Sequence, residues 1–204
     1  MKTNKALVEY LRHIGVLQTP AVISAFKKVD RKLFIPEHLR DLAYSDSALP
    51  IGAGQTISQP YVVAFMLELL DAHKGDRVLD VGSGSGYTTA LLATIVGPRG
   101  RVLGVEIVHE LVEYGRRNLR AFHFPHAEIR QAANKIGLPR EAPFDRILVS
   151  ASAPDIPNAL IAQLTIGGRM VAPVRDAIVS VTKETGERLS IETHPGFAFV
   201  PLVG

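Results

Sequence analysis

The chain has 204 residues, of which 47% are hydrophobic and 21% charged, and its formal net charge is +3. This composition is typical of a globular protein with a substantial core and excludes the disordered and fibrous classes. The sequence contains no cysteine, which excludes a disulfide framework, a zinc-thiolate site and a cysteine nucleophile. The small net charge does not indicate a nucleic-acid partner.

Two short helices are predicted at the N-terminus. Asn4 is a candidate N-cap for a helix that Gly15 would end. Thr19 followed by Pro20 is typical of the start of a second helix, because proline fits the first helical position. No secretory apolar segment is recognisable there, so we expect a cytoplasmic protein.

The segment 30–59 carries prolines and glycines and no sustained period, so we expect an ordered but irregular region with a functional role. Ser58 precedes an apolar stretch that ends at Leu70 and is predicted to cap that helix through its hydroxyl. The apolar run 61–70 is interrupted by Glu68 and has about half of the length that a membrane span needs. We therefore expect no membrane partner.

Beyond residue 70 strands and helices alternate, with short links marked by glycine or proline. This alternation predicts an α/β fold with a mostly parallel sheet covered by helices on both faces. The tail differs, because two runs around the turn 184–187 predict an antiparallel hairpin, followed by an edge strand at 197–202. The expected strands are 77–81, 101–106, 127–131, 144–150, 169–174, 178–183 and 188–193, and the expected helices are 87–96, 110–121 and 157–164.

A glycine-rich loop follows the first of these strands. Residues 78–86 read Val-Leu-Asp-Val-Gly-Ser-Gly-Ser-Gly, so that the strand carries Asp80 near its end and glycine then occupies every second position. Such a turn lets the backbone approach a ligand closely and marks a nucleoside site at the carboxyl end of the sheet. Glu106 ends the next strand about 20 residues later, a spacing at which a carboxylate accepts the ribose hydroxyls.

The identity of the nucleoside follows from the glycine spacing. The dinucleotide fingerprint G-x-G-x-x-G requires a last glycine where this chain has Tyr87. This difference favours a nucleoside without a pyrophosphate, and S-adenosyl-L-methionine is the main candidate. NAD remains the competing ligand, because a ribose-binding glutamate serves both cofactors.

The methyl acceptor is constrained by the end of the fourth strand. Residues 150–154 read Ser-Ala-Ser-Ala-Pro and lack the Asn/Asp-Pro-Pro-aromatic turn that methylation of nucleobase amines usually requires. A carboxylate acceptor is ionised at neutral pH and needs no general base, which fits the absence of an evident catalytic dyad. His123 and His126 are separated by Pro125 and do not indicate a metal site.

Several motifs follow one another along nearly the whole chain. The most specific are Gly-Gln-Thr-Ile-Ser-Gln-Pro at 54–60 and the glycine loop at 78–86. In these motifs the sequence resembles the protein-L-isoaspartate (D-aspartate) O-methyltransferase family. Further segments similar to the family's pattern are 29–36, 43–46, 141–145, 153–157, 163–173 and 199–202.

The resemblance implies a Rossmann-like S-adenosylmethionine-dependent methyltransferase fold in a single domain over 1–204. A helical cap with a substrate and cofactor loop would occupy 1–58, and the cofactor-binding core with its C-terminal antiparallel strands 59–204. The implied reaction methylates the free α-carboxylate of L-isoaspartyl residues, or the β-carboxylate of D-aspartyl residues, in damaged proteins and peptides. The ester then closes to a succinimide, which starts the repair. We expect the chain to act as a monomer.

The resemblance also implies the site residues. Ser58 takes the place of the family's serine at the reacting centre, and Tyr61 stands where family members often carry histidine. The residues implied in cofactor binding are Thr56, Ile57, Gln59, Tyr61, Asp80, Gly82, Ser83, Gly84, Gly86, Glu106, Ile107, Ala133 and Asn134.

One segment departs from the family's pattern. Ala132, Ala133 and Asn134 stand where the family usually has Gly-Asp-Gly, whose aspartate lies beside the adenine. Loss of that acceptor would cost roughly 1 to 3 kcal/mol of binding if the adenine amino group were left unpaired, unless the amide oxygen of Asn134 replaces it. This departure leaves open a non-catalytic relative that binds damaged protein or cofactor. The cofactor loop in a short chain also leaves open a small-molecule carboxyl methyltransferase.

Overall fold

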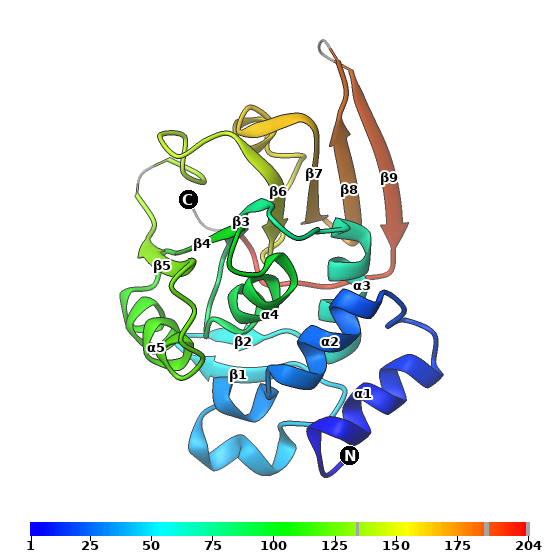
Figure 1. Ribbon diagram of the computed structural model, residues 1–204, viewed down its shortest axis with the longest axis vertical. Helices are drawn as coiled ribbons and strands as arrows, with labels where there is room; N and C mark the ends of the chain where they lie inside the picture. Colours follow the sequence, from blue (N-terminus) through cyan, green and yellow to red (C-terminus); the bar gives the residue numbers. More distant parts are fainter. Residues whose placement is uncertain (134, 186–187, 203–204) are drawn as a thin grey trace.

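A seven-stranded sheet forms the centre of the molecule (Figure 1), in the order β5-β4-β3-β6-β7-β8-β9. The structure is a computed structural model that describes residues 1–133, 135–185 and 188–202. Strands β3 to β7 pair in parallel, whereas β8 and β9 are antiparallel to their neighbours. The predicted fold class is thereby confirmed. The strands are β3 (Arg77–Val81), β4 (Arg101–Glu106), β5 (Ala127–Gln131), β6 (Phe144–Val149), β7 (Leu164–Val174), β8 (Ala177–Lys183) and β9 (Leu189–Pro195).

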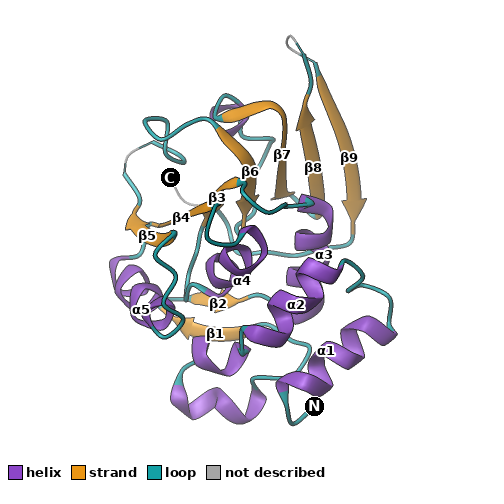
Figure 2. Cartoon of the chain, viewed as in Figure 1, coloured by secondary structure: helices purple, strands orange, loops and turns teal. Residues whose placement is uncertain are grey.

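Both faces of the parallel sheet are covered, which explains why its central strands read as apolar runs. Successive side chains of a strand point to opposite faces, so Val78 and Val102 join one hydrophobic cluster, whereas Leu79 and Leu103 join another. The first cluster includes buried residues of the helices α1 to α5, and the second includes those of α6. Figure 2 shows the helices in purple beside the orange strands of the sheet. The core helices are α3 (Pro60–Leu70), α4 (Tyr87–Val96), α5 (His109–Arg120) and α6 (Asn158–Ile161).

The N-terminal region precedes the sheet and packs below it in Figure 1. It contains the two predicted helices, but the cap of the first is different, because the hydroxyl of Thr3 accepts the backbone N–H of Ala6 at 3.1 Å. Asn4 instead donates its amide to the carbonyl of Phe26 at 2.8 Å and ties the two helices together. The elements are α1 (Asn4–His13), α2 (Pro20–Lys28) and the 3-10 helices η1 (Arg31–Phe34) and η2 (Glu37–Leu42).

The segment expected to be irregular contains more structure than its sequence indicates. Besides the two 3-10 helices, β1 (Leu49–Gly52) pairs antiparallel with β2 (Gln55–Ile57). The prediction of a hydroxyl cap from Ser58 on α3 is wrong, because Gln59 occupies the N-cap position without a side-chain hydrogen bond. The orphan N–H of Tyr61 is satisfied instead by the carboxylate of Asp46, which comes from a distant part of the chain.

The C-terminal part contains the predicted hairpin, but the segment after it differs from the prediction. Strands β8 and β9 pair along their length, from Ala177 opposite Pro195 to Lys183 opposite Leu189, and their far ends reach past the neighbouring strands in Figure 1. The turn residues 186 and 187 lie outside the described residues. The predicted edge strand at 197–202 is wrong. Phe197 N donates to Asp176 O at 3.0 Å, and further along the segment Ser152 donates to Val200 O at 2.8 Å and accepts from Leu202 N at 2.7 Å, which forms an isolated bridge and no strand.

Two element boundaries also differ from the prediction. The helix expected over 157–164 has four residues, Asn158–Ile161, because β7 already begins at Leu164, where it pairs with Phe144. Strand β7 then contains an irregularity before its register with β6 resumes at Arg169. Within the described ranges, the helices are all too short or too polar to cross a membrane.

Candidate functional site

A cavity opens at the carboxyl ends of β3 and β4, where a parallel sheet of this type binds its ligand. Its empty volume, with the open mouth included, is about 1070 Å³. We call it the donor cavity. It is lined by the glycine loop 82–85, the strand end 105–108, Ala132 and Ala133, residues 135–137, and the segment 55–58.

The structure brings most of the predicted site residues together around this cavity. Asp80, Gly86, Gln59 and Tyr61 are not among the residues that line it. Asn134 lies outside the described residues. Those that line it are Thr56, Ile57, Ser58, Gly82, Ser83, Gly84, Glu106, Ile107 and Ala133.

The glycines of the loop are required by its backbone conformation. Gly82, Gly84 and Gly86 have φ values of +78°, +52° and +87°, a region that other residues adopt only with strain. A Cβ on Gly86 would lie 3.1 Å from the carbonyl oxygen of Gly115 in α5. Gly82 and Gly84 therefore shape the cavity wall, whereas Gly86 allows α4 to approach α5.

Glu106 holds the walls of the donor cavity in place. Its side chain is only 6% exposed, and its carboxylate accepts three backbone N–H groups. Oε2 accepts from Gly84 at 2.9 Å, and Oε1 accepts from Ile107 at 2.8 Å and Val108 at 2.9 Å. A carboxylate has about four acceptor positions, so one remains on Oε2 for a ligand hydroxyl.

Asp80 lies behind the loop and is fully buried. Its Oδ2 accepts the hydroxyls of Thr88 at 2.7 Å and Thr89 at 2.6 Å, which fixes the first turn of α4. Burial raises the pKa of Asp80 to about 6, an effect that the two hydroxyls reduce and the charge of Glu106 reinforces. The geometry gives Asp80 a supporting position under the glycine loop.

The wall of the donor cavity after β5 carries no acidic side chain among its described residues. Ala132 and Ala133 present small apolar side chains, followed by Ile136 and Gly137. The amide of Gln163, which is 2% exposed, holds this segment, since its Oε1 accepts Leu138 N at 2.7 Å and its Nε2 donates to Ile136 O at 3.0 Å. Lys135 also lines this wall, which is otherwise built from small or apolar residues and is fixed by the buried side chain of Gln163.

A second cavity adjoins the first on the side of the β1–β2 hairpin. We call it the acceptor groove, and it shares Thr56, Ser58, Ser150, Val200 and Pro201 with the donor cavity. None of the described residues that line it has a titratable side chain. Its other lining residues are Ala48, Gln59, Val62, Ala198 and Phe199.

Comparison with known proteins identifies the family. The family model for protein-L-isoaspartate(D-aspartate) O-methyltransferase (PCMT) matches residues 2–204. The chain belongs to this family. The motif-based resemblance is therefore confirmed over the whole length of the sequence.

Individual PCMT relatives agree with this assignment. The protein-L-isoaspartate O-methyltransferase of Methanopyrus kandleri is 46% identical, over 100% of this chain and 92% of the relative. That of Methanothrix thermoacetophila is 47% identical, over 97% of this chain and 93% of the relative. A PCMT structure from Plasmodium falciparum in complex with S-adenosyl-L-homocysteine superposes with a TM-score of 0.85 at 26% identity, over 100% of this chain and 99% of that one.

Asp46 and Gln163 hold segments beside the two cavities, and these contacts were not predicted from the sequence. Asp46 belongs to the motif at 43–46, but nothing local indicates that its carboxylate reaches Tyr61. Gln163 was part of a motif at 163–173, and its burial inside an apolar stretch is the signal that could have revealed a structural role. Tyr61 itself contributes its backbone N–H to Asp46 and stacks its ring on Phe65, with the centroids 6.3 Å apart.

Proposed function

We propose that this chain transfers a methyl group from S-adenosyl-L-methionine to the free α-carboxylate of L-isoaspartyl residues, and to the β-carboxylate of D-aspartyl residues, in damaged proteins and peptides. One observation carries the proposal. The donor cavity and the acceptor groove meet at Thr56, Ser58 and Ser150, and no titratable side chain lines the acceptor groove within the described residues. The identification of the substrate as an isoaspartyl residue is supported by family membership and by the names of the relatives.

The groups that line the donor cavity suit the proposed cofactor. Glu106 offers an acceptor position for a ribose hydroxyl, and the backbone at Gly82 and Gly84 leaves room where a Cβ would project. Ser83 is among the residues that line the cavity, and its hydroxyl is buried without a hydrogen-bond partner among the described residues. Ala132 and Ala133 offer an apolar surface to a base. When bound, S-adenosyl-L-methionine supplies an electrophilic methyl group.

The acceptor groove suits a carboxylate. An acceptor carboxylate is already ionised at neutral pH, so no side chain has to remove a proton. The Ser58 hydroxyl is half-buried at the junction of the two cavities and does not cap α3, so it can donate a hydrogen bond to one carboxylate oxygen and orient the other. Val62, Val200 and Pro201 provide apolar surface that excludes water from the reacting atoms.

A transfer assay with labelled S-adenosyl-L-methionine tests this proposal. We expect an alkali-labile methyl ester on an isoaspartyl peptide and none on the aspartyl peptide of the same sequence. Binding of S-adenosyl-L-homocysteine without transfer to either peptide would favour a non-catalytic relative. Transfer to small carboxylic acids in preference to the peptide would favour a small-molecule methyltransferase. NAD serves as the ligand control and is expected to leave the melting temperature unchanged.

Three further expectations belong to the same proposal. A single domain over 1–204 is supported by the first hydrophobic cluster, which extends from Leu7 in α1 to Ile178 in β8. A monomer is supported because one chain lines both cavities, and light scattering tests it. A cytoplasmic location is the third expectation, and cell fractionation tests it.

A further inference from the structure

The start of helix α3 lies directly after the segment that carries Ser58. Pro60 is the first helical residue and has no N–H, so Tyr61 is the first residue of the helix with a backbone N–H to satisfy. The N-cap residue Gln59 contributes no side-chain hydrogen bond. Oδ1 of Asp46 accepts the Tyr61 N–H at 2.8 Å, across 15 residues of sequence. A carboxylate at this position also interacts favourably with the positive end of the helix dipole.

The turn that carries Asp46 is itself held by a buried arginine. Arg31 is fully buried, and its Nη2 donates to the carbonyl of Ser47 at 3.3 Å. Its guanidinium lies 5.4 Å from the ring centroid of Tyr87, and Tyr87 is both the first residue of α4 and part of the donor cavity wall. A continuous set of contacts thus runs from the donor cavity through Arg31 and the turn at Asp46 to the backbone of Tyr61.

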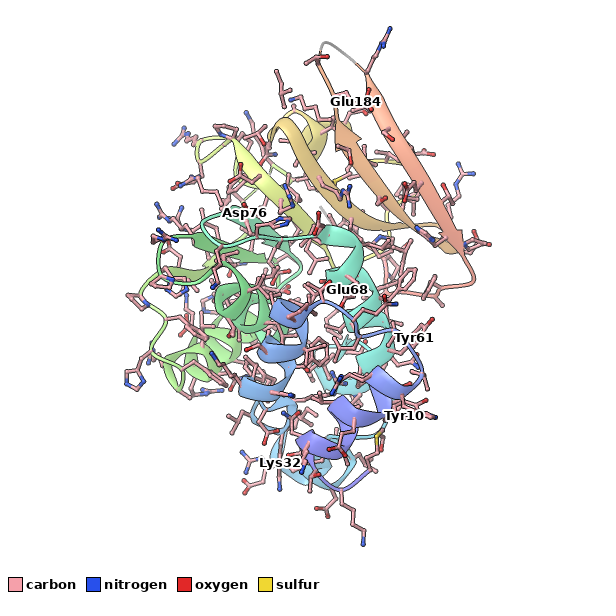
Figure 3. All side chains as sticks on the ribbon, turned by 45° about the vertical axis from the view of Figure 1, so that its right-hand side comes forward. Tyr10, Lys32, Tyr61, Glu68, Asp76 and Glu184 are labelled. Atoms are coloured by element: carbon pink, nitrogen blue, oxygen red, sulfur yellow. The ribbon has the colours of Figure 1, made fainter. Side chains whose placement is uncertain are left out.

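Ser58 is three residues before the hydrogen bond at Tyr61, and only Gln59 and Pro60 intervene. Pro60 has a fixed φ, and Gln59 has the extended conformation of an N-cap residue. The backbone of Ser58 therefore has little freedom to move relative to the start of α3. The place of the Ser58 hydroxyl between the two cavities therefore depends on where α3 begins. In Figure 3, Tyr61 and Glu68 mark the two ends of this helix.

From these contacts we infer that Asp46 is a positioning residue for methyl transfer. Its carboxylate fixes the first turn of α3 and thereby holds Ser58 at the junction of the donor cavity and the acceptor groove. This inference rests on the proposed function, because it assigns Ser58 to the reacting centre. Asp46 does not line either cavity, so its effect on catalysis is indirect.

Three variants separate positioning from general stability. Asp46→Ala removes the acceptor for Tyr61, whereas Asp46→Asn keeps an oxygen in its place. Thr3→Ala is the matched control, because it removes the side-chain cap of α1, whose hydroxyl accepts from Ala6 at 3.1 Å at an exposed site outside both cavities. Each variant is measured for kcat and KM with an isoaspartyl peptide, for affinity toward S-adenosyl-L-homocysteine, and for melting temperature.

We expect Asp46→Ala to lower kcat/KM for the peptide by about tenfold or more, since a displaced positioning group has effects of up to about a hundredfold. Cofactor affinity should stay unchanged, Asp46→Asn should restore most of the activity, and Thr3→Ala should lower only the melting temperature. The inference is overturned if Asp46→Ala affects catalysis no more than Thr3→Ala, or if it weakens cofactor binding as much as it slows transfer.

Amide hydrogen exchange separates failure of this inference from failure of the proposed function. Asp46→Ala should accelerate exchange at the Tyr61 amide, and Thr3→Ala should leave it unchanged. If the wild-type protein methylates no isoaspartyl peptide, the proposed function fails whatever the exchange result. If the wild-type protein is active and exchange at Tyr61 is unchanged in Asp46→Ala, the positioning inference alone is refuted.

Discussion

The two sides of the site are built differently. On the donor side, Glu106 is 6% exposed and accepts three backbone N–H groups, and the fully buried Asp80 accepts two hydroxyls. On the acceptor side, Thr56 is exposed, Ser58 and Gln59 are half-buried, and the wall at 198–201 is joined to the sheet by the pairing of 200–202 with Ser152. The donor side is fixed by buried carboxylates, whereas the acceptor side is built from short segments at the surface.

This difference fits the two ligands. A nucleoside cofactor is always the same molecule, so a preorganised cavity binds it without reorganisation. A damaged polypeptide varies around its isoaspartate, and backbone and small polar groups such as Ser58 and Ser150 suit a variable partner. Changes on the donor side should therefore affect stability and cofactor binding together, and changes on the acceptor side should affect turnover alone.

The largest effect is expected for Glu106→Ala. The substitution leaves three N–H groups of the donor cavity without their acceptor, and each buried unsatisfied group costs about 1 to 3 kcal/mol. We expect the free energy of unfolding to fall by about 3 kcal/mol or more, and affinity for S-adenosyl-L-homocysteine to fall about a hundredfold. Calorimetry and denaturant titration measure both quantities. An unchanged stability would show that the carboxylate does not hold the cavity walls.

A smaller effect is expected for Gly86→Ala. The new Cβ would combine a positive φ with a contact of 3.1 Å to the carbonyl of Gly115, so we expect a loss of about 3 kcal/mol. Gly15→Ala is the control, since Gly15 has a φ of +78° at the left-handed position that ends α1 and nothing lies within 4 Å of the added Cβ. It should cost about 1 kcal/mol. Equal losses in urea titration would mean that helix packing does not require Gly86.

Asp80→Asn tests the buried carboxylate through pH. The pKa of Asp80 is about 6 in the folded protein and 3.8 ordinarily. Between about pH 4 and 6 the folded protein therefore keeps a proton on Asp80 that the unfolded chain has already lost. The resulting stability is present below about pH 4 and is lost as pH rises through 6. At pH 7 Asp80→Asn should therefore be more stable than the wild type by about 3 kcal/mol. Thermal unfolding from pH 4 to 7.5 measures the difference, and a gap that does not grow with pH contradicts the account.

The smallest effect is expected on the acceptor side. Ser58→Ala should lower kcat about tenfold through loss of one orienting hydrogen bond, which corresponds to about 1.4 kcal/mol. Stability and cofactor affinity should stay unchanged, because Ser58 caps no helix. Steady-state kinetics and thermal unfolding measure these quantities. A lower melting temperature with unchanged kcat would assign Ser58 a structural role instead.

The sheet and the donor cavity could be predicted from local patterns. The strand bounds predicted at 77–81, 101–106 and 127–131 agree with the structure. A turn residue adjoins each strand, since Gly82 follows the first, Gly100 precedes the second and Pro125 lies two residues before the third. The proximity of Gly84 and Glu106 could also be predicted, because both residues lie at the carboxyl ends of adjacent parallel strands.

The acceptor side was harder to predict because tertiary contacts decide it. Strands β1 and β2 have four and three residues, too few for a periodic pattern. The cap of α3 comes from Asp46, 15 residues away, so a local interpretation selected Ser58 instead. The segment 197–202 has the composition of a strand, but its backbone hydrogen bonds go to Asp176 and Ser152, which lie in loops, and not to an edge strand of the sheet.

Methyl transfer to a matched pair of peptides tests the central claim most directly. Labelled S-adenosyl-L-methionine is incubated with an isoaspartyl peptide and with its aspartyl counterpart at pH 6, 7 and 8. The account predicts an alkali-labile ester on the isoaspartyl peptide alone, at a rate that changes little with pH, because the acceptor is ionised throughout and the acceptor groove supplies no titrating group among its described residues. Equal transfer to both peptides, no transfer to either, or a rate that rises about tenfold per pH unit, as a required deprotonation would impose, would contradict it.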